Sequence, residues 1–256
     1  MTVTSTASPF GIHLRQWRTL RGLSQLDLAG RAESTPRHIS FLETGRSRPR
    51  RATVLKLGDA LDLPPRECNE LLGAAGLAPE FSEFGLADEA LGAYRTAIDA
   101  LLSSHEPYPA CVIDRWGSVV LSNDAFERFS PGLSDMTPEQ LIEATFGSEE
   151  GRAWVENWQD LAWAYVDRVS TLAARSADDR LLTLVDKVRS YLAGAPRPET
   201  TANPHVVARL RMGDTTLSTF TTFLRFENAH DVTLSEATVE LIFPANDATK
   251  AFFEAR

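Results

Sequence analysis

The chain has 256 residues, of which 43% are hydrophobic and 24% are charged, and its formal net charge is −9. Two domains fit this length, because a domain usually holds roughly 100–150 residues, and the apolar share is enough for a packed core. The composition excludes a disordered chain, a collagen-like chain and a small protein held together by disulfides.

Sequence features that would send the chain to a membrane or an oxidising compartment are missing. Every apolar segment is shorter than the ~20 residues that cross a bilayer, and the opening MTVTSTASPF does not have the pattern of a signal peptide. The two cysteines, Cys68 and Cys111, lie far apart, without neighbours at metal-ligand spacing. We expect a reduced, cytoplasmic protein without cofactor, metal or membrane partner.

The charge is divided unevenly along the chain. Residues 1–76 carry a net charge of +4, whereas the remainder carries −13. Between Phe10 and Arg51, nine arginines stand against three acidic residues. A basic segment joined to an acidic one favours a nucleic-acid-binding domain coupled to a second function.

The basic segment is predicted to form five short helices over residues 10–76, after a disordered tail at residues 1–9. Apolar residues at helical spacing mark each helix. Ser24 is a good N-cap for the second helix. Thr35 and Pro36 predict the start of the third, because a capping hydroxyl followed by proline at the first helical position favours a helix start.

The acidic part follows a segment of linker-like composition at residues 77–87 and is predicted to mix helices and strands over residues 88–256. Alternating or continuous apolar residues mark the strands, and a turn at Arg115-Trp116-Gly117 joins the first two. The expected strands are 109–114, 119–121, 205–212, 215–228 and 232–243. The expected helices are 88–103, 137–146, 149–175, 177–192 and 247–255.

The segment SQLDLAGRAESTPRHISFLETGRSRPR resembles the helix-turn-helix of Cro/C1-type (XRE family) regulators, over roughly residues 10–76. The residues that carry the resemblance are Leu23, Ser24, Gln25, Ala29, Ile39, Leu42, Glu43 and Gly45, followed by an Arg/Pro loop. The resemblance implies a five-helix, lambda-repressor-like DNA-binding domain. A helical bundle with a solvated arginine face is the plainer alternative.

The expected DNA-binding residues lie on and around the third helix. They are Gln25, Thr35, Pro36, Arg37, His38, Ser40, Phe41, Arg46 and Arg48. Gln25 can donate to a phosphate at a helix N-terminus, and Arg37 is the expected base reader, because a guanidinium can pair with guanine O6 and N7 together. Arg46 and Arg48, like Arg50 and Arg51, are expected to meet phosphates, whereas His38 could meet a base, a phosphate or water.

Two positions depart from the family pattern. Glu33 stands in the turn where the family usually has glycine, which predicts an altered turn or a longer second helix. Pro36 replaces a residue that often bonds to bases, which reduces the polar code of the helix.

The segment EPYPACVIDRWGSVVLSNDAFERF has the strand–turn–strand–helix opening of a PAS-like domain, with Asn123 and Phe126 after the second strand. With the ending VTLSEATVELIFPANDATKAFF, residues 88–256 resemble the MmyB-type ligand-binding domain of bacterial regulators. The resemblance implies a multi-domain protein of α and α+β class, whose second domain is a PAS-like antiparallel sheet packed with helices. It also implies a small apolar ligand such as a fatty acid.

Large rings concentrate in this second domain, and the expected ligand-binding residues are Trp154, Trp158, Trp163, Phe220 and Phe223. Rings at such spacing form a core, or they line an apolar cavity between the sheet and the helix at 149–175. Three indoles within ten residues favour a cavity, because each N–H needs a partner.

Catalysis is not expected. The sequence has no G-x-S-x-G elbow, phosphate-binding glycine loop or H-E-x-x-H helix, and its five histidines are isolated. We expect a transcription regulator that binds double-stranded DNA as a homodimer on a near-palindromic operator, since one recognition helix offers little surface. In the alternative, the acidic domain docks a protein partner instead of a small molecule.

Overall fold

The computed structural model describes residues 8–198, 206–226 and 229–255, and the chain forms two compact units. The first unit holds the chain up to Glu83 together with Ala174–Ser176 and Ala229–Ser235; the second holds Phe84–Ala173, Ala177–Asn228 and Glu236–Arg256.

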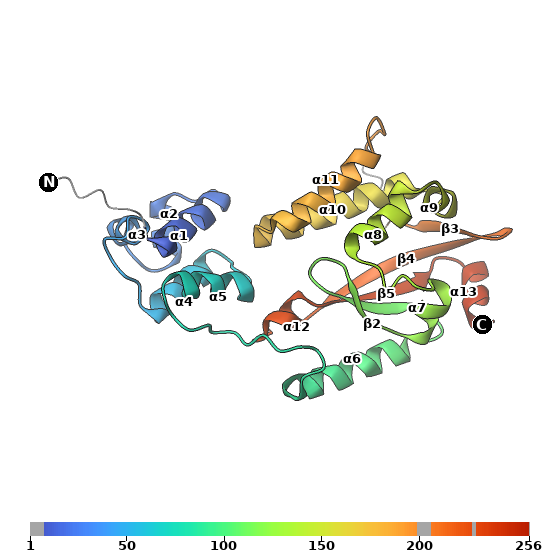
Figure 1. Cartoon of the computed structure of the whole chain (residues 1–256), viewed down its shortest axis with the longest axis horizontal. Helices are drawn as coiled ribbons and strands as arrows, with labels where there is room; N and C mark the ends of the chain where they lie inside the picture. Colours follow the sequence, from blue (N-terminus) through green and yellow to red (C-terminus); the bar gives the residue numbers. More distant parts are fainter. Residues whose placement is uncertain (1–7, 199–205, 227–228, 256) are drawn as a thin grey trace. The chain divides into compact units, whose positions relative to one another are not determined.

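Between Ser8 and Glu83 the described chain forms five helices, as predicted. They are α1 (Pro9–Leu20), α2 (Gln25–Arg31), α3 (Pro36–Glu43), α4 (Arg51–Ala60) and α5 (Pro65–Ala74), drawn in blue to cyan in Figure 1. Both predicted N-caps are confirmed, because Ser24 and Thr35 each accept a hydrogen bond from a backbone N–H in the first turn. Ser8 caps α1, so the predicted tail ends earlier; its residues 1–7 lie outside the described part.

One apolar core joins these helices. Its buried members are Phe10, Leu14, Trp17, Leu28, Ala29, Ala32, Ile39, Leu42, Val54, Leu57, Leu61, Leu71 and Leu72. The helices have only 7 to 12 residues, a length at which a helix alone is marginal in water. The five helices therefore depend on this shared core for their stability.

The turn between α2 and α3 contains Glu33, whose φ of 48° lies in the left-handed region. Glu33 thus adopts a backbone conformation that usually favours glycine. Its carboxylate lies 2.8 Å from Lys56 Nζ on the surface. Because α2 ends at Arg31, the second helix is not lengthened as the sequence suggested.

The segment after α5, at residues 78–81, packs against the helices of the first unit. The Asn69 side chain donates to Phe81 O at 2.8 Å and accepts from Glu80 N at 2.9 Å. Arg51, the first residue of α4, donates to Ala78 O at 2.7 Å and also pairs with Glu80. These contacts hold the beginning of the linker-like segment.

A five-stranded antiparallel sheet runs through the described part of the second unit, in the order β2-β1-β5-β4-β3 (Figure 1). The strands are β1 (Ala110–Ile113), β2 (Val119–Ser122), β3 (Ala208–Met212), β4 (Thr215–Arg225) and β5 (Thr238–Pro244). This confirms the predicted PAS-like antiparallel sheet packed with helices.

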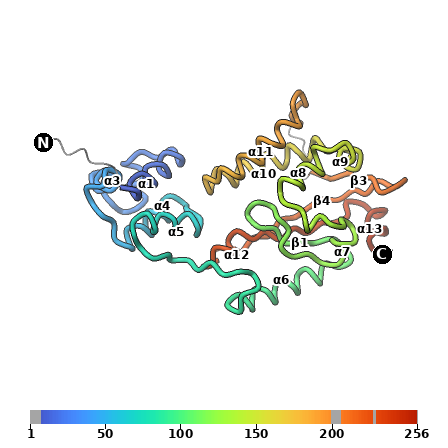
Figure 2. Tube along the Cα trace, in the orientation of Figure 1, coloured from blue at the N-terminus to red at the C-terminus, as the bar shows by residue number. Residues whose placement is uncertain are grey.

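Helices cover both faces of the sheet (Figure 2). On one face, Ile98 and Leu102 of α6 (Gly92–Ser104) cluster with Val112 and Val239. The other face carries α10, and the remaining elements surround these layers. They are η1 (Glu89–Leu91), α7 (Asp124–Phe129), α8 (Pro138–Ile142), the π-helical turn η2 (Glu143–Gly147), α9 (Glu149–Trp154), α10 (Trp158–Ser176), α11 (Asp179–Tyr191), α12 (Val232–Glu236) and α13 (Asp247–Glu254).

The single helix expected over 149–175 is wrong, because it is interrupted between α9 and α10. Val155 is extended, with φ −100° and ψ 97°, and forms a β-bridge with Leu210 of β3. The Asn157 side chain accepts from Arg209 N at 2.9 Å. The bridge to β3, a strand far along the chain, thus determines the local structure at Val155, although the apolar residues around it are spaced as in a helix.

Other boundaries also differ from the prediction. The strand expected at 232–243 starts only at Thr238, because Asp231 Oδ1 accepts from Leu234 N and opens α12 instead. Ala177, expected inside a helix, ends α10 with a left-handed φ of 52°. The ends of two expected strands, at residues 205 and 227–228, lie outside the described residues.

Asn123 joins three parts of the second unit. Its Oδ1 accepts from Ala110 N and from Phe126 N, both at 2.9 Å, and its Nδ2 donates to Leu102 O and Tyr108 O. A buried amide needs all these partners, and this one has them. Asn123 thereby ties the start of α7 to β1 and to the end of α6.

We predict that Gly11→Ala destabilises the first unit by roughly 1–3 kcal/mol, the usual cost of overpacking. A Cβ on Gly11 would lie 2.5 Å from Glu43 O and 2.7 Å from Leu42 O, so α1 would have to move away from α3. Hydrogen exchange of the α1 amides in the full chain measures the loss. Gly30→Ala is the control, since no atom of the described residues lies within 4 Å of a Cβ at this position and alanine favours a helix. Equal protection in the two variants would contradict this packing.

Candidate DNA-binding surface and ligand site

A buried carboxylate fixes the third helix. Glu43, the last residue of α3, is 5% exposed and accepts from Arg18 Nε at 2.6 Å and from Gln25 Nε2 at 2.8 Å. Arg18 also donates to Leu23 O at 2.7 Å, and its hydrogen bond to Glu43 raises its pKa. A buried charge is costly without such partners, so this network holds α3 against α1 and α2.

These contacts change the expected role of Gln25. Its side-chain amide, predicted to bind a phosphate, already donates one hydrogen bond to Glu43. Since an amide nitrogen carries two hydrogens, the second remains for another acceptor. In the structure, therefore, Gln25 positions α3.

Phe41 brings two of the expected DNA-binding arginines together. The Cζ atoms of Arg37 and Arg46 lie 5.2 Å and 6.0 Å from the centroid of its ring. Arg46 N also donates to Phe41 O at 2.8 Å. Cation–π contacts of this kind are worth about 0.5–1 kcal/mol each at exposed sites. The half-buried ring thus holds the two guanidinium groups near one another.

The other expected residues of α3 lie at its N-terminal end and along its side. Thr35 is the exposed N-cap and Pro36 the exposed first residue. Ser34 Oγ lies 3.1 Å from His38 Nδ1, so the imidazole already has a polar neighbour. Ser40 is half-buried, and its carbonyl accepts from Thr44 Oγ1.

The arginines near α3 divide into two kinds. Within the described residues, Arg37, Arg46, Arg48 and Arg50 have no carboxylate at ion-pairing distance. Arg51, by contrast, pairs with Glu80 and donates to Ala78 O, so its guanidinium already has partners within the protein. Among the described residues, four arginines on α3 and in the segment between α3 and α4 therefore have exposed side chains without an acidic partner.

In the second unit, two of the expected tryptophans lie at the break between α9 and α10. Trp154 Nε1 donates to Met212 Sδ at 3.4 Å. Trp158 is the first residue of α10, and Arg152 Cζ lies 4.6 Å from the centroid of its ring. Both rings are half-buried and pack against the cluster that contains Leu217. The two side chains therefore contribute to the apolar core and remain partly exposed to solvent.

Trp163 lies apart from these two, in the second turn of α10. It packs on the cluster between α10 and α11, and Arg197 Cζ lies 5.4 Å from its ring. Its buried indole N–H has no hydrogen-bond partner among the described residues.

Phe220 and Phe223 lie on opposite faces of the sheet, because three positions separate them on a regular strand. Phe220 stacks on Phe243 at 5.3 Å. Phe223, 41% exposed, faces α10, since Arg168 Cζ lies 4.7 Å from its ring. The structure thus places only Phe223 between the sheet and α10.

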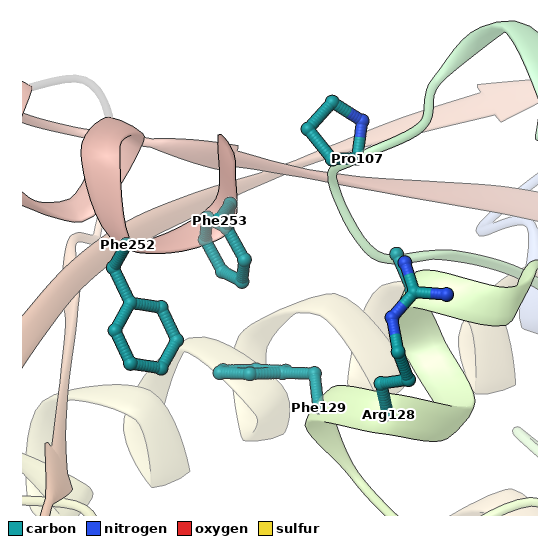
Figure 3. A pocket seen from close by; sticks show the side chains of 6 residues that line it. Pro107, Arg128, Phe129, Phe252 and Phe253 are labelled. Atoms are coloured by element: carbon teal, nitrogen blue, oxygen red, sulfur yellow. The ribbon is translucent and has the colours of Figure 1, made fainter. Parts of the chain in front are cut away.

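One pocket of the second unit lies between α7 and α13 (Figure 3). It is lined by Pro107, Ala125, Arg128, Phe129, Phe252 and Phe253. Its empty volume of about 250 Å³ includes space open to solvent and is below the roughly 300–1,000 Å³ of typical ligand sites. None of the expected ligand-binding residues lines it.

Sequence reasoning missed three polar residues. Arg168 and Glu240 lie at the contact between α10 and the sheet, whereas the Tyr165 ring packs with Phe146 on the cluster beside α11. Their signal is a polar group inside an apolar pattern. Tyr165 and Arg168 share a helical stripe with Leu161, and Glu240 interrupts the strand VELIF. A charge at such a position has either a structural partner or a function.

The comparisons with known proteins agree with this architecture. Residues 94–255, well over half of the chain, match the MmyB-like transcription regulator ligand binding domain. The chain belongs to this family. Residues 9–71 of the MmyB-like regulator match a helix-turn-helix domain, so both resemblances drawn from the sequence are confirmed. The protein is a DNA-binding transcription regulator with a ligand-binding domain.

No curated protein matches this MmyB-like regulator. A solved structure, the restriction-modification controller protein C.AhdI from Aeromonas hydrophila, is 38% identical to it. The match covers 24% of the regulator and 92% of that protein, with a TM-score of 0.23.

The described part of the MmyB-like regulator has no group of three histidine, cysteine or acidic side chains that could hold a metal ion. Burial raises the pKa of Cys68 to about 11 and raises that of Cys111 as well, so both thiols stay protonated near neutral pH. None of its described helices is long and apolar enough to cross a membrane.

Proposed function

We propose that this MmyB-like regulator recognises a specific DNA sequence through α3 and senses a small apolar ligand through its second unit. The group of exposed arginines without acidic partners carries the first part: Arg37, Arg46, Arg48 and Arg50. DNA phosphates would supply the missing negative charge. The functional division is a DNA-binding domain at 10–76, a linker at 77–87 and a sensor at 88–256.

Within this proposal the residues around α3 have different tasks. Arg37 reads a base from the exposed N-terminal half of the helix, whereas Arg46 and Arg48 bind phosphates after it. Thr35, Pro36, His38 and Ser40 complete the contact surface. Phe41 supports Arg37 and Arg46, and Gln25 offers its second amide hydrogen to a phosphate.

We predict that Arg37→Ala weakens binding to the correct operator by roughly 1–3 kcal/mol and weakens binding to random DNA much less. The bidentate contact with guanine exists only on the correct sequence. Fluorescence anisotropy on both DNAs, at several salt concentrations, measures the two losses. Arg51→Ala is the control and should leave both affinities nearly unchanged, because Arg51 bonds to Ala78 and Glu80. An equal loss on both DNAs would show that Arg37 only touches phosphate.

We further propose that the regulator acts as a homodimer, held by residues 88–256. One recognition helix of 8 residues buries too little surface for the specificity that a genome demands. The prediction is a dimer in sedimentation at micromolar concentration and a footprint of two half-sites, about 10 base pairs apart or a multiple of that. A monomer that protects one asymmetric half-site would contradict the dimer.

The proposed ligand is a small apolar molecule, such as a fatty acid. The rings of Trp154, Trp158, Trp163 and Phe223 around α10 support this proposal, since aromatic side chains commonly line apolar sites. Burial yields about 0.8 kcal/mol per CH₂, so a long acyl chain gains on the order of 10 kcal/mol before ordering costs. The ligand regulates DNA binding only as far as it prefers one conformation of the protein.

We predict that medium- and long-chain fatty acids quench tryptophan fluorescence, raise the melting temperature and change operator affinity. Trp158→Ala should weaken the ligand response and leave DNA binding by the free protein nearly intact. Trp116→Ala is the control, because Trp116 bonds to Asp178 at the opposite end of α10. If no fatty acid has any of these effects, fatty acids are excluded, and docking of a protein partner on the acidic domain becomes the favoured function.

This regulator would need neither catalysis nor a cofactor. Its function would consist of two binding reactions of the same chain, one with DNA and one with the ligand. Since it must reach DNA, we place it in the bacterial cytoplasm.

A further inference from the structure

The outward face of α3 carries one phenyl ring, that of Phe41. Arg37 and Phe41 lie four positions apart on this helix and so share a face, whereas Ile39 and Leu42 are buried in the core of the first unit. The Phe41 side chain is half-buried, so part of its ring is open to solvent. Exposed apolar area of this kind is unfavourable in water, and a contact that covers it is favourable.

The ring has cationic neighbours. The Cζ atoms of Arg37 and Arg46 lie 5.2 Å and 6.0 Å from its centroid. Arg37 belongs to α3, and Arg46 to the segment that follows this helix. The ring therefore lies between the group proposed to read a base and a group proposed to bind a phosphate. When both arginines contact DNA, the ring lies beside the edges of the bases.

The backbone around Phe41 fixes the position of the ring. Phe41 O accepts from Arg46 N at 2.8 Å and from Ser47 N at 3.1 Å. Two residues further along α3, the buried Glu43 carboxylate is bonded to side chains of α1 and α2. A side chain on a rigid element holds a more precise position than one on a free loop. Phe41 is thus able to distinguish between bases.

The major groove offers an apolar ring few partners. A recognition helix enters this groove, where the bases present hydrogen-bond donors and acceptors, and thymine in addition presents a C5-methyl group. Arg37 is the expected reader of guanine O6 and N7. Side chains four positions apart on a helix have Cβ atoms roughly 5–6 Å apart, and successive base pairs are about 3.4 Å apart. Arg37 and Phe41 can therefore reach adjacent base pairs.

We propose that the Phe41 ring contacts the C5-methyl group of a thymine in the base pair next to the guanine that Arg37 reads. The inference rests on the proposed recognition of a specific sequence by α3 and names part of that sequence. Each half-site then contains a guanine with a thymine in an adjacent pair. Arg37 makes the polar contact and Phe41 the apolar one. Uracil, which lacks the methyl group, leaves the ring partly uncovered.

The first experiment selects tightly bound sequences from a random library of duplex DNA with the full chain. We expect every enriched half-site to contain a guanine with a thymine, on either strand, in an adjacent base pair. Repeating the selection with Arg37→Ala should remove the preference for that guanine. Repeating it with Phe41→Ala should remove the preference for the thymine and keep the guanine.

The second experiment replaces this thymine by uracil in the selected operator. The exchange removes the methyl group and keeps every hydrogen-bonding group of the base. By fluorescence anisotropy at constant salt, the wild-type chain should bind the uracil operator about fourfold more weakly per half-site, the value of one buried methyl group. Phe41→Ala should bind both operators equally. The wild-type comparison changes only the DNA and holds even if Phe41→Ala unfolds.

Leu26→Ala is the matched control. Leu26 is another apolar side chain of the first unit, 68% exposed, but it lies on α2. This variant should keep the fourfold preference for thymine over uracil. Arg46→Gln should weaken binding to both operators by the same factor, because a phosphate contact does not depend on the base.

The outcomes separate this inference from the proposed function. If the enriched half-sites lack a thymine beside the guanine, or if uracil binds as tightly as thymine, the methyl contact is wrong while sequence recognition by α3 stands. If Phe41→Ala keeps the preference for thymine, another residue reads the methyl group and the inference is wrong. If the selection enriches no sequence, both proposals fail.

Discussion

A charge that folding removes from water must meet another charge or a set of hydrogen bonds, and this constraint organises both units. Glu43 meets it with Arg18 and Gln25, which fixes the recognition helix. In the second unit, Arg115, whose side chain is 10% exposed, pairs with Asp178 at 2.9 Å and Glu236 at 2.6 Å. These pairs join segments far apart in sequence and specify how the helices meet.

The sequence predicted the first unit well because its signals are local. Ser24 and Thr35 cap helices within three residues of themselves, and the apolar residues of each helix recur at one spacing. The contacts of Arg51 could not be foreseen in the same way. Its partners lie about thirty residues further on, at Ala78 and Glu80, and a run of arginines gives no sign of which member is occupied.

In the second unit the prediction failed where a distant strand decided the local structure. Val155 leaves the helix because Leu210 offers it a β-bridge, and nothing near residue 155 announces this. The placement of Phe220 and Phe223 on opposite faces, by contrast, could have been predicted from the sequence. Side chains alternate along a strand, so two residues an odd number of positions apart lie on opposite faces. Counting the positions would have left Phe223 alone beneath α10. The approach of Arg168 to Glu240 could not be found from the sequence, because the two residues lie on a helix and a strand far apart in the chain.

The attachments of α10 have a mechanical consequence. Before its first turn, Asn157 bonds to Val207 O and Arg209 N at β3; just after its last turn, Asp178 bonds to Arg115 and Trp116 in the turn that leads into β2. β3 and β2 are the two outermost strands of the sheet. The helix is therefore attached to the sheet near both of its edges, one attachment at each end of the helix. Because both ends of α10 are held, a force on the middle of the helix would be transmitted to both attachments.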